Sequence, residues 1–564
     1  MSDNRNQTGA DLVTSALEEY GVSRIFGNPG TTELPLLRSL SSSDMEYVLG
    51  LHEDIAVGMA AGYASTRRYH AYDDDSILPL GVANLHVGPG TAHGLGNLQN
   101  AMVSGVPLLV TAGNHSTDFQ HEEPILSGDL EGMAREYTKW STEVSDIAAL
   151  PTVLRRAVRV ALTPPTGPVF VSFPMDVLMA ETDADPERLG PIPTLGVGDS
   201  EQLDRAAEAL IDASDPAIVL GDWVGRSGSD AVSAAVDLAE ASGAPVYGEL
   251  ITCEVNFPHD HPQWISALPP VEDMARRHLE ADTLVLVGTH SNTTYIPHDT
   301  PLIDAETTCV QINPEAWEVG KNVPADVAVV GDPGEAMATI ASQVDDGITE
   351  ATRRSRIDRV AERRNWLDAG GDSDGTDASA TADVTKARLV DSLRDAAPDA
   401  FVVNESNTSK YPLIEGYDFQ PEQWLSNKNG GLGYGLPASL GAAVAWSEHP
   451  DSRSVVGFVG DGSFWYYPQS IYTAVRYGLD VTVVVPNNRS YHILKEGMTT
   501  IYGGSIDDHE YVGMDFEPEP GIAANARSHG AVAEHVQDLA DLDSTLDEAV
   551  TTEGPVVVDV SVSD

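Results

Sequence analysis

The chain has 564 residues and a formal net charge of −55, from 87 acidic and 32 basic residues. A field this negative disfavours binding to nucleic acid or to an anionic membrane surface. Two cysteines are too few for a disulfide framework or a structural zinc site. The sequence shows neither a basic and apolar leader nor a run of about 18 apolar residues. We therefore expect a cytoplasmic protein with no nucleic-acid or membrane partner.

The acidic residues are spread along the whole chain rather than gathered in one tail. A net charge of this size lies far beyond the range that ordinary solubility requires. We interpret it as adaptation to concentrated salt, which indicates a halophilic, haloarchaeal-type protein.

Helical and apolar strand patterns alternate throughout the chain. The patterns predict helices at residues 9–20, 56–67, 204–213 and 468–477. They predict strands at residues 108–111, 168–172, 283–287, 401–403, 454–459, 481–485 and 555–560. Such alternation is typical of α/β folds with parallel sheets. The length allows about three domains, so we expect three doubly wound parallel-sheet domains.

Composition indicates where these domains begin and end. A Pro- and Asp-rich stretch covers residues 184–199, and a low-complexity run rich in Gly and Asp covers residues 370–377. Such stretches are typical of surface linkers. We predict an N-terminal domain, a central domain, a linker and a C-terminal domain at residues 1–185, 195–345, 346–384 and 385–564.

Two short polar segments in the last third of the chain predict a magnesium site. Asp461 lies in the segment GDGS at 460–463, and Asn488 follows 27 residues later, after a predicted helix and strand. Because each segment follows a strand, we expect them to lie side by side at one sheet edge. The Asp461 carboxylate, the Asn488 side-chain oxygen and the Ser490 carbonyl form an all-oxygen ligand set suited to Mg²⁺. The alternative is a pair of unrelated turns.

Neighbouring residues are suited to hold a phosphate group. Gly460 and Gly462 permit a tight turn with the backbone close to phosphate, and Ser463 is placed to donate to a phosphate oxygen. The segment NESNTS at 404–409 also follows a predicted strand. Its small polar candidates for phosphate binding are Asn407 and Thr408.

Segments at 51–64 and 430–437 complete a pattern that resembles the thiamine diphosphate enzymes. The first, LHEDIAVGMAAGYA, is similar to the segment that carries the activating glutamate of that superfamily, and the second, GGLGYGLP, resembles its cofactor-bending loop. The resemblance implies that Glu53 contacts N1′ of the aminopyrimidine, that Leu432 wedges between the two rings and that the Gly430 carbonyl accepts from the 4′-amino group. Taken alone, the first segment is also typical of an acidic helix N-terminus and the second of a Gly-rich approach to a helix.

The segments GNPGTTELP at 27–35 and NLHVGPGT at 84–91 narrow the resemblance to the benzoylformate decarboxylase branch, within the 2-oxoacid decarboxylase and acetohydroxyacid synthase group. That branch implies that the Thr31 hydroxyl anchors the substrate carboxylate and that His86 transfers protons. The alternative for His86 is a loop histidine with its hydrogen bonds satisfied. The position of a second proton-transfer residue stays open among Tyr295, His298 and His290.

The residues that would form the substrate wall depart from this branch. Ile493 stands where the branch has a small residue, and Gly497 stands where it has an aromatic one. A flat phenyl pocket is therefore not implied. His492 and Lys495 are either surface residues on a helix or groups that favour a second anion on the substrate.

The resemblance implies a thiamine diphosphate- and Mg²⁺-dependent enzyme that converts a small 2-oxoacid into an aldehyde without oxidation. A carboligase of the acetolactate synthase type and a non-catalytic family member are the alternatives, and His86 favours the decarboxylase. The family also implies a homodimer or homotetramer with active sites at the subunit interface. The sequence leaves open which 2-oxoacid is used and whether the central domain binds FAD.

Overall fold

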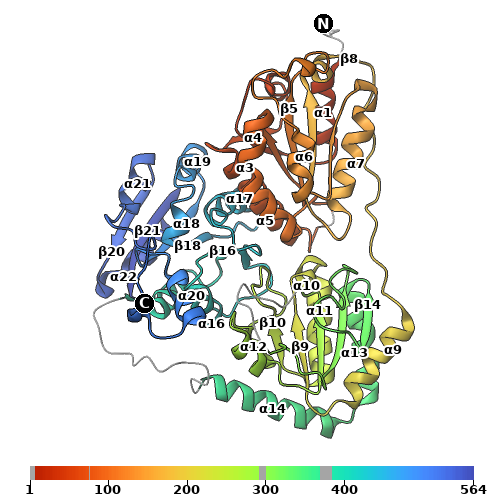
Figure 1. Ribbon diagram of the computed structural model, residues 1–564, viewed down its shortest axis with the longest axis vertical. Helices are drawn as coiled ribbons and strands as arrows, with labels where there is room; N and C mark the ends of the chain where they lie inside the picture. The colour runs from red at the N-terminus through yellow and green to blue at the C-terminus, as the bar shows by residue number, and fades with distance from the viewer. Residues whose placement is uncertain (1–6, 75, 291–299, 369–383, 564) are drawn as a thin grey trace.

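The computed structural model describes residues 7–74, 76–290, 300–368 and 384–563. Within these residues the chain forms three parallel sheets, each flanked by helices (Figure 1). The expectation of three α/β domains is confirmed. Among the described helices, none is long and apolar enough to cross a bilayer.

The first sheet contains the strands that precede the N-terminal motifs. In spatial order its strands are β3 (Glu46–Leu49), β2 (Arg24–Gly27), β4 (Gly81–Leu85), β5 (Leu108–Asn114), β7 (Val169–Pro174) and β6 (Trp140–Glu143). Its main helices are α1 (Gly9–Glu19), α2 (Leu34–Leu40), α3 (Glu53–His70), α5 (Leu95–Val103) and α7 (Leu150–Leu162). The carboxyl ends of β2, β3 and β4 lead directly into the segments 27–35, 51–64 and 84–91.

The second sheet lies in the central domain. Its strands are β11 (Trp264–Ala267), β10 (Val246–Gly248), β9 (Pro216–Leu220), β12 (Thr283–Val287), β13 (Thr308–Asn313) and β14 (Val327–Val330). Around it lie α9 (Ser200–Asp212), α11 (Ser229–Ser242), α12 (Glu272–His278) and α13 (Pro333–Gly347). Residues 183–199, which run from β8 (Glu181–Thr182) to α9, form neither helix nor strand.

The third sheet contains the strands that precede the C-terminal motifs. Its strands are β15 (Val384–Thr385), β21 (Pro555–Ser563), β19 (Val481–Asn487), β18 (Val455–Val459), β16 (Phe401–Glu405) and β17 (Trp424–Ser426), with β20 (Val532–Val536) also paired to β21. Its helices include α15 (Lys386–Ala396), α17 (Gly435–Glu448), α18 (Asp461–Phe464), α19 (Ser470–Tyr477), α21 (Ile522–His529) and α22 (Leu539–Thr551). β18 and β19 are buried along their whole length, as their continuous β-branched runs predict for strands covered on both faces.

One part of the predicted linker is helical. Helix α14 (Glu350–Asp368) occupies residues that composition had assigned to a linker at 346–384. It is held on the central domain by the buried guanidinium of Arg356, which donates to the carbonyls of Ser242 (2.8 Å) and Ala213 (2.6 Å). A polar contact of this kind leaves no apolar periodicity in the sequence. The low-complexity run at 370–377 lies outside the described residues.

Helices α3 and α17 join the first domain to the third (Figure 1). Their backbones approach so closely that a Cβ added at Gly62 would lie 2.1 Å from the Ala438 carbonyl oxygen. One at Gly441 would lie 2.0 Å from the Met59 carbonyl oxygen. Small residues at these crossings therefore let one buried core extend across both domains.

Candidate functional site

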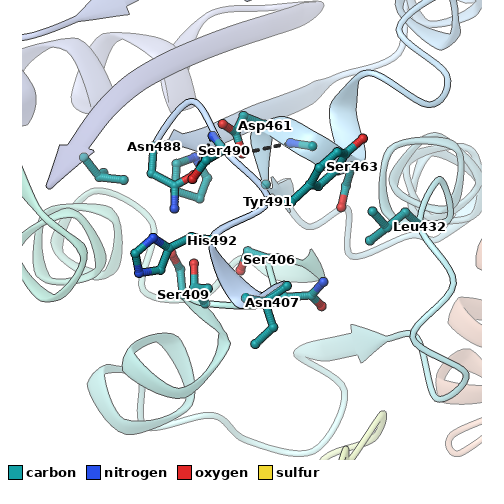
Figure 2. Close-up of a pocket in the computed structure, with 16 residues that line it drawn as sticks. Ser406, Asn407, Ser409, Leu432, Asp461, Ser463, Asn488, Ser490, Tyr491 and His492 are labelled. Atoms are coloured by element: carbon teal, nitrogen blue, oxygen red, sulfur yellow. Dashed lines mark hydrogen bonds between the residues drawn. The ribbon is translucent and has the colours of Figure 1, made fainter. Parts of the chain in front are cut away.

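A pocket, shown in Figure 2, lies at the carboxyl edge of the third sheet, where β16, β18 and β19 end side by side. Ligands of doubly wound sheets bind at such edges. The described residues that line it all belong to the third domain. They are Ser406, Asn407, Thr408, Ser409, Leu432, Gly460, Asp461, Gly462, Ser463, Pro486, Asn488, Ser490, Tyr491, His492, Ile493 and Val562.

This pocket brings together most of the residues that the sequence marked for cofactor and metal. Figure 2 shows Asp461, Asn488 and Ser490 gathered on one side, with Ser406, Asn407 and Ser409 across from them. All of the expected cofactor and metal residues line the pocket except Gly430. Gly430 lies in the neighbouring loop, where its φ of 70° requires the conformational freedom of glycine.

Asp461 carries the feature that best fits a cation. Its Oδ1 accepts a hydrogen bond from the Gly462 N–H (2.8 Å), whereas its Oδ2 is buried and has no hydrogen-bond partner among the described residues. Burial raises the pKa of Asp461 to about 6, and the Gly462 N–H offsets this only in part. An orphaned buried carboxylate oxygen is costly on its own, so a cation at this position would relieve the cost.

The loop after β19 is shaped by side chains beneath it. Asn487 donates to the buried Asp559 carboxylate (2.9 Å) and accepts from the Arg489 N–H (3.0 Å). Asn488 Oδ1 accepts from the Ser490 N–H (3.3 Å). These contacts hold Asn488 and Ser490 at the rim of the pocket beside Asp461, although the sequence pointed to neither the contacts nor Asp559.

A buried glutamate joins the phosphate-binding candidates to the ring-binding loop. Glu405 ends β16, next to Ser406, and its carboxylate accepts from the N–H groups of Tyr434 (3.0 Å) and Gly435 (2.9 Å) at the start of α17. Burial raises its pKa to about 7, while the Tyr434 and Gly435 N–H groups act in the opposite direction. The segments 404–409 and 430–435 are thus fixed to each other through one side chain.

His86 is held by a second buried glutamate in the first domain. Its Nδ1 lies 2.8 Å from Glu33 Oε2. Glu33 Oε1 accepts from the Thr32 hydroxyl (2.7 Å) and from the Gly113 N–H (2.8 Å). A Cβ added at Gly30 would lie 1.9 Å from His86 Nδ1, so only glycine leaves room for the ring. With Nδ1 facing Glu33, Nε2 is the ring nitrogen available to a substrate.

Glu53 begins α3 and faces a different neighbour. Its Oε2 lies 3.2 Å from His93 Nδ1. His52 caps the helix, because its Nδ1 accepts from the Asp54 N–H (3.1 Å). Thr31 is exposed, whereas Thr32 is buried. Glu53, His86 and Thr31 are not among the described residues that line the pocket of the third domain.

The remaining candidates fall in different places. His290 lies in the central domain, where its backbone N–H donates to the Glu249 carboxylate (2.8 Å). Tyr295 and His298 lie outside the described residues. Ile493 and His492 line the pocket, whereas Lys495 forms an ion pair with Asp515 (2.5 Å).

Comparison with known proteins identifies these domains. Three family models match in chain order: "Thiamine pyrophosphate enzyme, N-terminal TPP binding domain" at residues 7–144, "central domain" at 203–340 and "C-terminal TPP binding domain" at 413–560. The C-terminal match contains Leu432, Asp461 and Asn488, and the N-terminal match contains Glu53 and His86.

Relatives of two activities match over nearly their whole length. The chain is 28% identical to benzoylformate decarboxylase of Pseudomonas aeruginosa, covering 96% of this chain and 97% of that one. It is 27% identical to the acetolactate synthase isozyme 3 large subunit of Escherichia coli, covering 98% and 95%. A solved structure, the thiamine diphosphate-dependent 4-hydroxybenzoylformate decarboxylase of Rhodococcus jostii, matches with a TM-score of 0.84 and 26% identity over 99% of both chains.

The domain matches cover most of the first sheet, the central sheet and most of the third sheet, in the same order along the chain. The relatives are decarboxylases and synthases, and they extend over the same length of chain. The protein belongs to the thiamine pyrophosphate enzymes and is a thiamine diphosphate-dependent enzyme of the decarboxylase and acetolactate synthase type.

Proposed function

We propose that the protein decarboxylates a small 2-oxoacid to an aldehyde, using thiamine diphosphate and Mg²⁺. The observation that carries the proposal is the contact between His86 and the buried Glu33 carboxylate, at 2.8 Å. It orients an imidazole whose other nitrogen is available for a proton on the substrate. Thiamine diphosphate, when bound, supplies the electron sink that loss of carbon dioxide requires.

The third domain has the groups needed to hold the cofactor and its metal. Asp461 Oδ2, the Asn488 side-chain oxygen and the Ser490 carbonyl would bind Mg²⁺, a set of hard oxygen ligands that leaves room for phosphate oxygens. Three further side chains, Asn407, Thr408 and Ser463, would donate to the diphosphate. Leu432 and the Gly430 carbonyl would hold the rings, so each residue that the sequence marked keeps its proposed role.

In the first domain, Glu53 would hold a proton against N1′ of the aminopyrimidine. His86 Nε2 would move a proton to or from the reacting substrate, and Glu33 would stabilise the charged imidazolium. Thr31 carries an exposed hydroxyl that would bind the substrate carboxylate. We propose the same domain limits as the sequence indicated, with α14 belonging to the stretch between the second and third domains.

A carboligase of the acetolactate synthase type is the second candidate. The full-length match to acetolactate synthase of Escherichia coli favours it, whereas the His86 and Glu33 pair favours the decarboxylase. Incubation with pyruvate and an aldehyde acceptor separates the two, because a carboligase accumulates a hydroxyketone or acetohydroxyacid and a decarboxylase releases free aldehyde.

Replacing His86 with alanine is expected to lower decarboxylation turnover by about ten- to ten-thousand-fold, the loss that follows removal of a general acid–base group. Thiamine diphosphate affinity should change little, because His86 is assigned no cofactor contact. Steady-state kinetics at saturating substrate measures the loss. His121→Ala, at an exposed histidine of the same domain, is the control. Normal turnover in the His86 variant would assign that histidine a structural role.

We propose that the active unit is a homodimer or a homotetramer, with each site shared between subunits. Of the described residues, those lining the pocket of the third domain do not include Glu53. A two-fold axis would place the first domain of one subunit against the third domain of its partner and produce two equivalent sites. The 2-oxoacid would bind between them.

Complementation tests this arrangement. Inactive Glu53→Gln and Asp461→Ala chains, denatured and refolded together, should form mixed dimers with one intact site and recover up to about a quarter of wild-type activity. Each variant refolded alone is the control. If heterodimers are demonstrably present and remain inactive, each site is built within one chain.

The charge of −55 predicts a salt requirement. Like charges on the surface repel one another, and salt at about 1 M shortens the range of that repulsion to about 3 Å. The thermal midpoint, measured by circular dichroism, should rise from low salt to molar KCl. A flat or falling midpoint would contradict halophilic adaptation.

A further inference from the structure

A buried lysine links the loop before α17 to the central domain. Lys428 lies two residues before Gly430, and its Nζ is 3.0 Å from Asp222 Oδ2 and 2.5 Å from Glu249 Oε1. The Lys428 side chain is 6% exposed, and the two acidic side chains are exposed by 0% and 1%. This ion pair therefore crosses between two domains in a place that excludes water.

The two carboxylates occupy a position where doubly wound sheets usually bind a ligand. Asp222 follows β9 and Glu249 follows β10, and these strands are neighbours in the central sheet. Glu249 Oε1 also accepts from the Asp222 N–H (2.9 Å), and its Oε2 accepts from the His290 N–H (2.8 Å). Ligands bind outside the carboxyl ends of such strands. Here the ammonium group of Lys428 fills that position.

The charges of the three groups depend on one another. Burial disfavours the charged amine, but Asp222 and Glu249 outweigh it and raise the pKa of Lys428. Burial also opposes ionisation of both carboxyls. Lys428 acts together with Arg226 and His290 to lower the pKa of Asp222, and together with His290 to lower that of Glu249. All three groups are therefore charged at neutral pH, and removing one leaves a buried charge without compensation.

The first domain and the rest of the third domain also hold this loop. Asn97 of the first domain donates to the Gly433 carbonyl (3.3 Å). Glu405 of the third domain accepts from the N–H groups of Tyr434 and Gly435 at 3.0 and 2.9 Å. Between these contacts and Lys428 lies Leu432, which lines the pocket. The central domain thus supplies one of three anchors for a short loop.

We propose that Lys428 is a positioning residue through which the central domain fixes the ring-binding loop, residues 429–433, against the cofactor. The inference rests on the proposed function, because it takes Leu432 and Gly430 as the groups that hold the rings. Lys428 would touch neither cofactor nor substrate. It would act through the loop, by keeping Leu432 in the place that binding requires.

Two calorimetric titrations of the full-length protein test this. One ligand is thiamine diphosphate with Mg²⁺, and the other is inorganic pyrophosphate with Mg²⁺, which lacks the rings. Lys428→Met should weaken thiamine diphosphate binding by about ten- to a hundredfold, the loss that follows removal of groups that orient metal ligands from the outer shell. Pyrophosphate binding should be unchanged, because Asp461 and Asn407 keep their surroundings. Lys428→Arg should retain thiamine diphosphate affinity close to that of the wild type.

A charge-balanced double variant keeps the test informative if Lys428→Met alone does not fold. Lys428→Met with Glu249→Gln removes one charge of each sign and leaves Asp222 with Arg226, at 3.4 Å. The matched control is Lys321→Met with Glu318→Gln, a pair at 2.8 Å in which the lysine is 30% exposed. The double Lys428 variant should show the same split between the two ligands, and the control should not.

The other possible results overturn either the role of Lys428 or the proposed function. Equal weakening of both ligands, or no weakening, overturns the inference while leaving the proposed function intact. A double variant that does not fold would show that the ion pair serves the fold itself, and would also overturn it. A wild-type protein that binds neither ligand would instead overturn the proposed function, and the inference with it.

Discussion

Replacing Glu53 with glutamine is expected to leave the fold intact and to slow exchange of the C2 proton of bound thiamine diphosphate by about a hundred- to ten-thousand-fold. The reason is that glutamine keeps the size of the side chain but cannot hold a proton against N1′ of the aminopyrimidine. Glu53 opens α3 directly after the His52 cap, so the change leaves the helix start in place. Proton exchange followed by nuclear magnetic resonance after rapid quenching measures the effect.

Three controls make the Glu53 result decisive. Glu46→Gln, on an exposed side chain of β3, should exchange at the wild-type rate. The affinity of the Glu53 variant for thiamine diphosphate should remain close to that of the wild type. The residues assigned to the cofactor's diphosphate and to the metal all lie in the third domain. Circular dichroism should show an unchanged fold. Wild-type exchange in Glu53→Gln would refute the assignment of this glutamate.

Replacing Asp461 with alanine is expected to abolish the Mg²⁺-supported part of thiamine diphosphate binding. The change deletes a charged ligand and leaves the diphosphate charge uncompensated. Removing an outer-shell partner of a metal ligand lowers affinity by about ten- to a hundredfold. The loss in the Asp461 variant should be larger, because a direct ligand is removed. Fluorescence titration in the presence and absence of Mg²⁺ measures it, with Asp451→Ala, at an exposed position, as the control.

Two further observations separate a metal role from a structural one. Because Asp461 Oδ2 is buried and has no hydrogen-bond partner in the part of the chain that the structure describes, the metal-free variant should be at least as stable as the wild type. Because burial raises the pKa of Asp461 to about 6, the wild-type carboxyl is protonated below that pH and must lose the proton to bind Mg²⁺. Wild-type Mg²⁺ affinity should therefore weaken by about tenfold for each pH unit below 6. Equal affinity at pH 5 and pH 7 would contradict the role.

The fold could be predicted where buried strands consist almost entirely of apolar residues. The strands predicted at 283–287 and 454–459 appear as β12 and β18, the second beginning at Val455. Element ends were harder to predict, because polar residues stop an apolar run before backbone pairing stops. β19 continues to Asn487, which pairs with Ser561. Helix α3 begins three residues before the expected position 56, since histidine is an uncommon cap.

The metal ligands of the candidate site could be predicted from spacing because they lie close together in the sequence, whereas Asn407, Thr408 and Leu432 were marked by the strand that precedes them or by family resemblance. Asp461, Asn488 and Ser490 fall within 460–490, just after β18 and β19, which are neighbours in both sequence and space. The contact between Glu33 and His86 spans 53 residues, and the ion pair between Lys428 and Asp222 joins two domains. No spacing rule connects such residues, because their proximity depends on strand order and on how the domains pack.

The proposed decarboxylase function is tested most directly by measuring the products formed from a panel of aliphatic, aromatic and branched 2-oxoacids. The reactions are run in molar KCl, with and without thiamine diphosphate and Mg²⁺. We predict that at least one 2-oxoacid yields carbon dioxide and its aldehyde in equal amounts, only when both cofactors are present. His86→Ala should suppress this reaction, and His121→Ala should not. Acetolactate or another ligation product in place of free aldehyde, or turnover that continues after both cofactors are removed, would contradict the proposed function.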